Sequence, residues 1–530
     1  MTTVVKCKSG KYTYLYESTS YRNEDGNPRC HRKCVGRIDP VTGKEIYNPE
    51  YLERVWGTAK QPDIIHNVKK FFLMEDIEFS SRKVFGVNYL LNNIANSIGL
   101  TDTLKSSIPD LYEQILTIAN FMVSTGEPMM YCNYWLKRND GINIEGLSSQ
   151  MISKILLSIT DEDKMLFYKK WANTRLEHEL LALDITSVSS YSELIDAVAW
   201  GYNRDKEKLP QVNICLLVGE KSRLPVFQMV YNGALKDVST LKTSLAVLSG
   251  LKLSNISIIM DKGFASKNNI DAMLNDKDKI RFLLALPFTM KFTKDIVESV
   301  RSSIDSPDNT IVIGNDILRA VAKNMLWDDK HKIKAHIFYN AVSAYTKRDE
   351  LYGHISMLKE MILSGQYVDR YTKDIEKYLQ IKNSSRNQYG INIKIRDDII
   401  DKELANTGWM VAISNFIKNP KTALKIYRSK DVVEKAFDRM KNCIDLGRLR
   451  IQSDTAIQNK IFISFISLIL IARIHKVMLD QDLYKKWTMK ELFKILETNE
   501  VTYIQGQKIL HPLTSKHKEI FSAFGFQLPE

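Results

Sequence analysis

The sequence predicts an α/β fold: a mixed-sheet core interrupted by an insertion, preceded by a small β region and a helical domain. Three observations predict it. Apolar residues recur at helical spacing between about residues 84 and 180. Short β-branched runs then alternate with helical stretches as far as residue 287, and this rhythm breaks from about 288 to 405 before it resumes. The 530 residues allow about two to four domains, each with its own core.

The chain is strongly basic. Its 75 lysines and arginines exceed its 62 aspartates and glutamates, which gives a net charge of +13. Such a surplus suggests a polyanionic partner, and nucleic acid is the commonest one. The alternative is a soluble basic protein without such a partner.

Three features of the sequence indicate the cellular compartment of the protein. The first residues lack the apolar segment of a signal peptide. The longest apolar stretch, residues 461–472, is too short to span a bilayer, so we expect a buried helix and no membrane contact. Six scattered cysteines do not form a disulfide framework, which favours a reduced, cytosolic protein. A zinc site at Cys7, Cys30, His31 and Cys34 is a weaker alternative to free thiols, because the spacing is loose.

The first part of the chain predicts two structures. Residues 1 to about 50 have the pattern of short strands and turns. Residues 87–98, 111–124 and 150–159 have helical periodicity, and Ser148 lies in a region suited to cap the third helix. The helices are compatible with a helix-turn-helix DNA reader or with a plain helical bundle.

The next part predicts the core. Strand-like runs occupy residues 180–185, 213–218, 225–231, 256–260 and 282–286, with helices predicted over 238–251 and 266–274. The resulting order, β-β-β-α-β-α-β, is the one expected of a ribonuclease-H-like core, in which three antiparallel strands precede alternating helices and parallel strands.

The remainder contains the insertion and the end of the core. Polar helices such as 349–363 and strand-like pieces such as 391–395 predict an insertion, and the core resumes with a strand at 409–413 and a helix around Glu434. The predicted divisions are a β-rich region (1–83), a helical domain that could bind DNA ends (84–178), the first part of the core (179–287), the insertion (288–405), the second part of the core with the Glu helix (406–478) and a C-terminal tail (479–530).

Two aspartates stand out in this core. Asp184 and Asp261 each end an apolar strand, and Gly263 allows a sharp turn beside Asp261. If the strands are neighbours, the carboxylates lie close together and repel unless a cation such as Mg²⁺ lies between them. Alternatively, each aspartate only caps a helix at a strand-to-helix turn.

Glu434 is the third candidate. If residues 427–441 form one helix, a helical wheel places Lys430, Tyr427 and Lys441 within roughly 40° of Glu434. An apolar stripe lies beside them and consists of Val433, Phe437, Met440 and Ile444. That stripe can dock the helix on the sheet and aim Glu434 at the aspartates, while the lysines and tyrosine suit phosphate contact. An amphipathic helix with surface ion pairs, such as Lys430 with Glu434, is the alternative.

These residues carry a family resemblance. Tyr427, Lys430, Glu434 and Lys441 have the spacing of the Y-(2)-R-(3)-E-(6)-K signature of IS4-type insertion-sequence transposases, with Lys430 in place of the usual Arg. Residues 183–187 and 260–264 resemble the motifs around that superfamily's first and second aspartates. Residues 10–46, 201–205, 209–213 and 232–237 are similar to its IS1634 branch, so the resemblance covers most of the chain.

The resemblance implies a DDE transposase with a ribonuclease-H-like catalytic core and a largely β insertion. Asp184, Asp261 and Glu434 would hold two Mg²⁺ ions, with Mn²⁺ as a substitute, for cleavage at terminal inverted repeats and joining of the 3′-OH ends to target DNA. Tyr427, Lys430 and Lys441 would contact DNA, and the protein would act as a homodimer on DNA in the cytoplasm, associated with the bacterial nucleoid. An inactive or domesticated DNA-binding copy and a metal-dependent DNA nuclease without strand transfer remain as alternatives.

Overall fold

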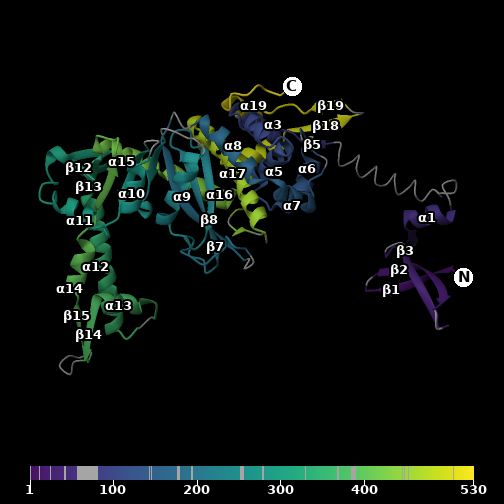
Figure 1. Ribbon diagram of the computed structural model, residues 1–530, viewed down its shortest axis with the longest axis horizontal. Helices are drawn as coiled ribbons and strands as arrows, with labels where there is room; N and C mark the ends of the chain where they lie inside the picture. Colours follow the sequence, from purple (N-terminus) through teal and green to yellow (C-terminus); the bar gives the residue numbers. More distant parts are fainter. Residues whose placement is uncertain are drawn as a thin grey trace. The chain divides into compact units, whose positions relative to one another are not determined.

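The computed structural model (Figure 1) describes residues 2–10, 12–23, 26–40, 43–56, 82–141, 144, 146–175, 179–191, 195–250, 256–276, 280–328, 330–366, 369–383, 390–444, 446, 448–449, 451, 453–504 and 507–529. The chain divides into two compact units. One comprises Met1–Arg82 with Tyr503–Gln507, and the other comprises Lys83–Thr502 with Lys508–Glu530.

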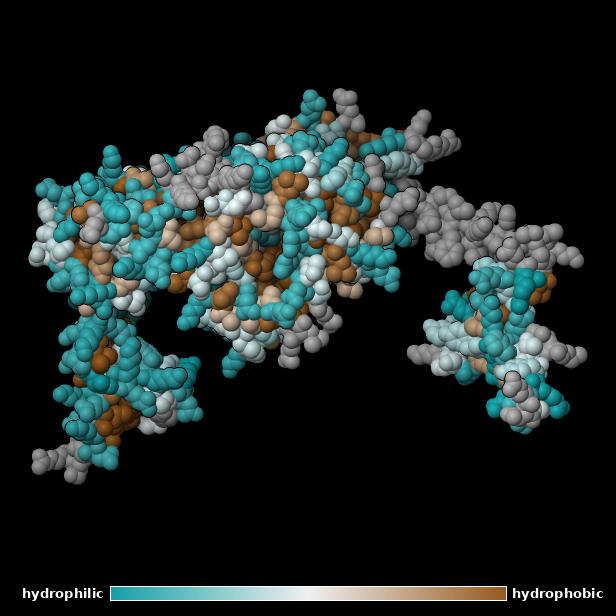
Figure 2. Space-filling model, viewed as in Figure 1, coloured by the Kyte–Doolittle hydropathy of each residue, from teal (hydrophilic) through white to brown (hydrophobic). Residues whose placement is uncertain are grey.

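The first unit is an antiparallel sheet followed by a helix. Its strands, in sheet order, are β1 (Thr2–Ser9), β2 (Tyr12–Arg22), β3 (Pro28–Ile38) and β4 (Glu45–Tyr47), and α1 (Pro49–Trp56) follows. Leu15 and Val35 are buried, while the visible face of the sheet and helix is mostly hydrophilic (Figure 2). Cys30, His31 and Cys34 lie on β3, and the described residues contain no group of three His, Cys, Asp or Glu side chains placed to hold a metal ion.

The second unit begins with helices. β5 (Arg82–Val84) precedes α3 (Gly86–Ser97), α4 (Leu100–Ser107), α5 (Tyr112–Thr125), η2 (Met129–Tyr131), α6 (Cys132–Arg138), α7 (Ser149–Ser158) and α8 (Asp161–Asn173). The three helices predicted here are α3, α5 and α7. The Ser148 side chain accepts a hydrogen bond from the Met151 backbone N–H, which confirms the predicted cap.

The core sheet follows in the predicted order. Strands β6 (Leu181–Ser190), β7 (Gln211–Gly219) and β8 (Pro225–Asn232) pair antiparallel. After α9 (Asp237–Gly250), β9 (Ser257–Met260) pairs parallel with β6, and after η3 (Lys262–Phe264) and α10 (Lys267–Leu274), β10 (Arg281–Leu286) pairs parallel with β9. Leu251, the predicted end of the first helix, lies outside the described residues. The β-β-β-α-β-α-β succession is therefore confirmed.

The sheet extends further than predicted. After α11 (Lys291–Glu298) and η4 (Pro307–Asn309) come β11 (Thr310–Ile313), β12 (Asp316–Leu326) and β13 (Lys332–Tyr339), and β13 pairs with β16 (Trp409–Ser414), which pairs with β10. The order through the described strands is β11-β12-β13-β16-β10-β9-β6-β7-β8, with β17 (Arg448–Leu449) also on β6. Strands from the predicted insertion thus belong to the central sheet, because β13 buries Ile333, Ala335 and Ile337 in the same core.

The rest of the predicted insertion has a small core of its own. It contains α12 (Ala341–Leu363), η5 (Asp369–Tyr371), α13 (Thr372–Tyr378), β14 (Leu379–Asn383), β15 (Ile391–Ile395) and α14 (Asp397–Leu404). Buried residues from the helices, such as Ile355, Leu358 and Ile400, form this core together with Leu379. The expectation of a largely β insertion is wrong, because the apolar positions of α12, α13 and α14 recur at helical spacing.

The last part combines the Glu434 helix with a long buried helix. α15 (Pro420–Ser429) and α16 (Asp431–Cys443) precede α17 (Asp454–Asp480), which packs against α3, α5, α7, α16 and β8. Helix α17 has 27 residues and is long and apolar enough to cross a membrane. However, 83% of its most apolar 18-residue stretch is buried within the protein. All of residues 461–472 are buried, which confirms the predicted core helix. The chain ends with η6 (Leu483–Lys485), α18 (Met489–Glu497), β18 (Glu500–Ile504), β19 (Gln507–Leu510) and α19 (Ser515–Ala523).

Candidate active site

The two aspartates are brought together by adjacent parallel strands. Leu183 on β6 is aligned with Met260 on β9, so Asp184 and Asp261 follow these partners at the same level of the sheet. Asp184 was predicted to end its strand, but β6 continues to Ser190. The reason is that Ile185 to Ser189 stay paired with β7 after β9 has ended, and their small polar side chains are buried. Asp184 therefore lies where the pairing with β9 stops.

Asp184 is a largely buried carboxyl group. Its side chain is 19% exposed, and Oδ1 accepts a hydrogen bond from the Ile185 backbone N–H at 2.8 Å. Burial raises the pKa of Asp184, while the positive charges of Lys430 and Arg204 act in the opposite direction. The nearby Asp261 charge also raises it, which agrees with two carboxylates in electrostatic contact.

Asp261 is held by two hydrogen bonds. It caps η3, and its Oδ1 accepts from the Lys262 backbone N–H and, at 2.8 Å, from the Tyr427 hydroxyl. Burial, followed by the Asp261 charge, raises the pKa of Tyr427, so the phenol keeps its proton and remains a donor. Tyr427 thus positions the second aspartate. The prediction that it contacts phosphate stays a prediction.

Glu434 lies on a helix that is shorter than predicted. We expected residues 427–441 on one helix, but α15 ends at Ser429 and α16 begins at Asp431. The Ser429 hydroxyl donates to the Ile426 carbonyl, and the Val433 N–H bonds to the Lys430 carbonyl three residues back, which tightens the junction. Lys430 keeps a right-handed helical backbone at this junction, so its side chain still reaches Glu434.

Lys430 connects the glutamate to the first aspartate. Its Nζ lies 2.6 Å from Glu434 Oε1 and 3.6 Å from Asp184 Oδ2. The Lys430 side chain is 7% exposed, whereas that of Glu434 is 57% exposed. Burial alone would lower the pKa of Lys430, but Asp184 and Glu434 together raise it above its ordinary value. A buried ammonium ion therefore lies between two carboxylates.

The chemistry of the donor set suits a divalent metal ion. Asp184, Asp261 and Glu434 supply carboxylate oxygens, which Mg²⁺ and Mn²⁺ prefer, and the Lys430 ammonium is a stand-in cation between two of them. Within the described part of the chain, no three acidic, His or Cys side chains are close enough to hold a metal ion directly. Asp184 and Glu434 are joined through Lys430, and Asp261 is bonded to Tyr427, so the three carboxylates do not converge on one point.

Two further ion pairs border the acids. Arg204 donates from Nη2 to both carboxylate oxygens of Asp237 at 2.7 Å, and its charge reaches Asp184. Lys441 is bonded at 2.6 Å to Asp205, and the prediction that it contacts DNA stays a prediction. We assigned no role to Arg204, Asp205 or Asp237 from the sequence. The signal was their presence in the segments that resemble the IS1634 branch.

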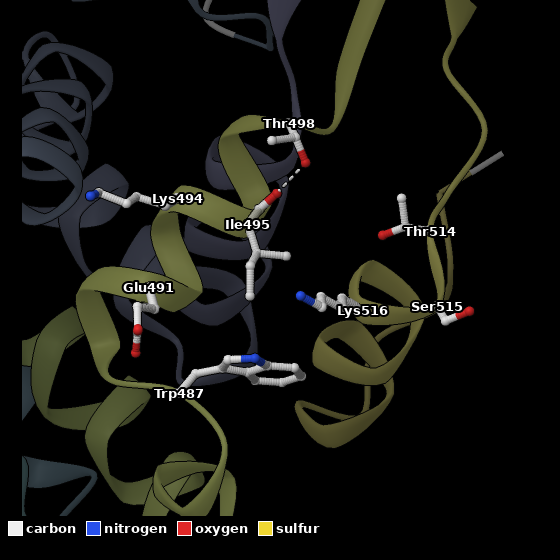
Figure 3. A pocket seen from close by; sticks show the side chains of 8 residues that line it. All are labelled: Trp487, Glu491, Lys494, Ile495, Thr498, Thr514, Ser515 and Lys516. Atoms are coloured by element: carbon white, nitrogen blue, oxygen red, sulfur yellow. Dashed lines mark hydrogen bonds between the residues drawn. The ribbon is translucent and has the colours of Figure 1, made fainter.

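A separate pocket lies between α18 and α19. It encloses about 700 Å³ and contains none of the predicted site residues. In Figure 3 the Trp487 indole lies at one end, and the Thr498 hydroxyl donates to the Ile495 carbonyl on α18. The lining consists of Trp487, Glu491, Lys494, Ile495, Thr498, Thr514, Ser515 and Lys516.

The mixed sheet carries two adjacent aspartates, and a lysine links the first of them to a glutamate on α16, which together form an acidic candidate site. Residues 175–470 match the family described as "Transposase DDE domain". The match covers more than half of the chain and includes all six predicted site residues. The chain belongs to the DDE transposase family.

Other comparisons add little. No curated protein matches the chain. One solved structure with a detectable likeness is the "Cryo-EM structure of piggyBac transposase synaptic complex with hairpin DNA", at 9% sequence identity and a TM-score of 0.36. The likeness covers 76% of this chain and 70% of that one.

Proposed function

We propose that this DDE transposase belongs to the IS4 superfamily, IS1634 branch, and moves an insertion sequence. It cleaves DNA at terminal inverted repeats and joins the resulting 3′-OH ends to target DNA. The observation that carries the proposal is the placement of Asp184 beside Asp261, with Glu434 tied to Asp184 through Lys430. Membership of the family and the +13 charge support DNA as the substrate.

Divalent metal ions are the general cofactors of DDE transposases, and here Asp184, Asp261 and Glu434 would hold them. We propose two Mg²⁺ ions per site, replaceable by Mn²⁺. When bound, such ions supply an activated hydroxyl nucleophile and stabilise the leaving oxygen of an in-line displacement. The catalytic unit would then be a ribonuclease-H-like fold, which the β8-β7-β6-β9-β10 order of strands supports.

The chain's own side chains prepare the site. Tyr427 fixes the orientation of Asp261 through its hydrogen bond, and the Arg204–Asp237 pair places a positive charge near Asp184. Lys430 and Lys441 contact the phosphates of the transposon end in this proposal, and Tyr427 lies close enough to the acids to contact a phosphate near the cleavage point. Because both lysines are paired with acids in the free protein, DNA binding exchanges a carboxylate partner for a phosphate.

The proposal includes a homodimer on DNA, because the two ends of an element are cut together, in the cytoplasm with the bacterial nucleoid. A single-turnover assay checks the dimer. Complexes with one protein copy should cleave slowly or not at all, and full-rate cleavage by them would refute it.

The central experiment is a cleavage and joining assay with DNA that carries the inverted repeats beside the gene. Wild-type protein with Mg²⁺ should leave a joinable 3′-OH, and Asp184→Ala should abolish the reaction. Cleavage without joined products would identify a nuclease. Tight binding to the ends without cleavage in Mg²⁺ or Mn²⁺ would identify an inactive or domesticated copy.

A further inference from the structure

Lys430 occupies an unusual place for a lysine. Its ammonium group is almost fully buried and contacts carboxylates from two different elements, Asp184 on β6 and Glu434 on α16. Lysines are rarely buried unless paired. The pairing therefore accounts for the burial, and in return the ammonium neutralises charge that would otherwise destabilise the packed acids.

The ammonium and a divalent ion require the same oxygens. Glu434 Oε1 accepts a charge-assisted hydrogen bond from Lys430 at 2.6 Å, and Asp184 Oδ2 lies 3.6 Å from the same nitrogen. A metal ion bound to both carboxylates would lie within a few ångströms of Nζ, where two cations repel strongly in a partly buried site. Glu434 can therefore join Asp184 and Asp261 around a metal ion only after Lys430 has left.

The position of Lys430 suits such a departure. It lies at the junction of α15 and α16, outside the regular hydrogen bonding of either helix interior. A lysine carries a point charge on a flexible stem, whereas an arginine would bind a carboxylate through two parallel hydrogen bonds and resist displacement. The lysine found here is therefore the more easily displaced of the two cations.

We infer that Lys430 is an internal competitor of the metal ion: it neutralises Asp184 and Glu434 in the metal-free protein, and metal binding displaces its ammonium group. The inference rests on the proposed metal site at Asp184, Asp261 and Glu434. The displaced ammonium becomes free to bind an anion, and a DNA phosphate is the anion that the proposed function brings to it. Metal binding and DNA binding are thereby coupled through the side chain of Lys430.

The test is a titration of the full-length protein with Mn²⁺ in the absence of DNA, with free Mn²⁺ measured by electron paramagnetic resonance. Lys430→Met should bind Mn²⁺ about tenfold more tightly, the scale of one lost charge-assisted contact. In the presence of a chelator, Lys430→Met should melt at a lower temperature than wild type. Mn²⁺ should raise the melting temperature of this variant by more than it raises that of wild type. Lys430→Arg should bind Mn²⁺ no more tightly than wild type. Lys435→Met is the matched control, since Lys435 lies in the first turns of α16, close to Lys430 in sequence, but pairs with Asp431. The Mn²⁺ affinity of this variant should not change.

Equal or weaker Mn²⁺ binding by Lys430→Met would overturn the inference. If that variant does not fold, Lys430→Arg decides, because tighter binding by the arginine variant contradicts competition. Asp184→Asn separates this inference from the proposed function. If Asp184→Asn binds Mn²⁺ like wild type, the metal site itself is wrong. If it loses Mn²⁺ while Lys430→Met gains no affinity, only the competition is wrong.

Discussion

Helices α16 and α17 pack against each other, yet they bury their surfaces differently. α16 buries one stripe, formed by Val432, Val433, Ala436, Phe437 and Met440, and leaves Glu434 and Asp438 exposed. α17 is buried on almost all sides, and its Phe462 and Phe465 lie edge-on to aromatic rings of α8. One helix thus has an exposed polar stripe that includes Glu434, whereas the other has hardly any free surface.

This difference in burial implies that α16 contributes to catalysis and α17 to stability. A helix with an exposed stripe can present a carboxylate to a site without losing its packing, whereas a helix buried all round can only support its neighbours. Substitution of Glu434 on the polar stripe of α16 should therefore change activity at nearly constant stability. Substitutions in α17 should change stability, and activity only as a result.

The largest expected effect is on the polar stripe of α16. Glu434→Gln should lower DNA cleavage by about 10³-fold or more, because a neutral amide is a poor metal ligand. Binding to the DNA ends and the melting temperature should stay close to wild type, since Glu434 is exposed. Cleavage rate and end binding are measured in parallel. Asp438→Asn, one turn further along the same stripe, is the control. Retained cleavage by Glu434→Gln would remove Glu434 from the site.

The second effect concerns α17. Phe465 is fully buried against Phe167 and Tyr168, so Phe465→Ala should lower the free energy of unfolding by about 3–5 kcal/mol. Denaturant unfolding measures it. Leu479→Ala, at a position 40% exposed near the end of the same helix, should cost far less. Equal losses in the two variants would show that α17 is not the buried centre described above.

A third, smaller effect lies between the two helices. Burial, followed by the positive charges of Arg439, Arg223 and Lys435, lowers the pKa of His475 on α17 to about 4. Because this value is below the ordinary 6.5, the folded protein binds fewer protons than the unfolded chain as the pH falls. The contribution of His475 to stability is therefore complete above pH 6.5 and is lost as the pH falls towards 4.

We expect a loss of about 1 kcal/mol by pH 5, after allowance for the partial exposure of His475. Unfolding at several pH values, compared with His475→Gln, measures it. His336, whose pKa burial also lowers to about 4, contributes equally to both proteins, so the difference between them isolates His475. Identical pH profiles would contradict the prediction.

The smallest effect is on the outer side of α16. Lys435 and Asp431 form an ion pair in which both side chains are 52% exposed. Such pairs contribute little, so Lys435→Met should change the free energy of unfolding by no more than about 0.5 kcal/mol. Thermal unfolding at low and high salt checks this. A loss above about 1 kcal/mol would mean that the exposed side of α16 tolerates substitution less well than the comparison with α17 requires.

Much of the fold was predictable because it depends on local patterns. The alternation of β-branched runs and amphipathic stretches predicted β6 to β10, and the uniform apolarity of residues 461–472 predicted a buried helix. The extension of the sheet was not predictable in this way. β13 joins the core only by pairing with β16, whose residues follow about seventy positions later in the chain, and no local pattern encodes that pairing.

The candidate site was likewise predictable only where it depends on local patterns. An acid at the end of an apolar run marked Asp184 and Asp261, and helical spacing linked Lys430 to Glu434. The serines after Asp184 have the composition of a loop, so their burial against β7 was missed. Neither the break between α15 and α16 nor the burial of Lys430 follows from spacing. The Arg204–Asp237 pair joins residues 33 positions apart through the folded structure alone.

The burial of α17 also has a consequence for biosynthesis. Its partners α3, α5, α7 and β8 all precede it in the chain, so a ribosome produces their apolar faces well before the helix that covers them. Until residue 480 has emerged, these faces are open to chaperones and to aggregation. A copy of the gene shortened by a stop codon ahead of residue 454 would thus yield insoluble protein that proteases remove, instead of a soluble fragment able to occupy DNA ends and inhibit the intact enzyme.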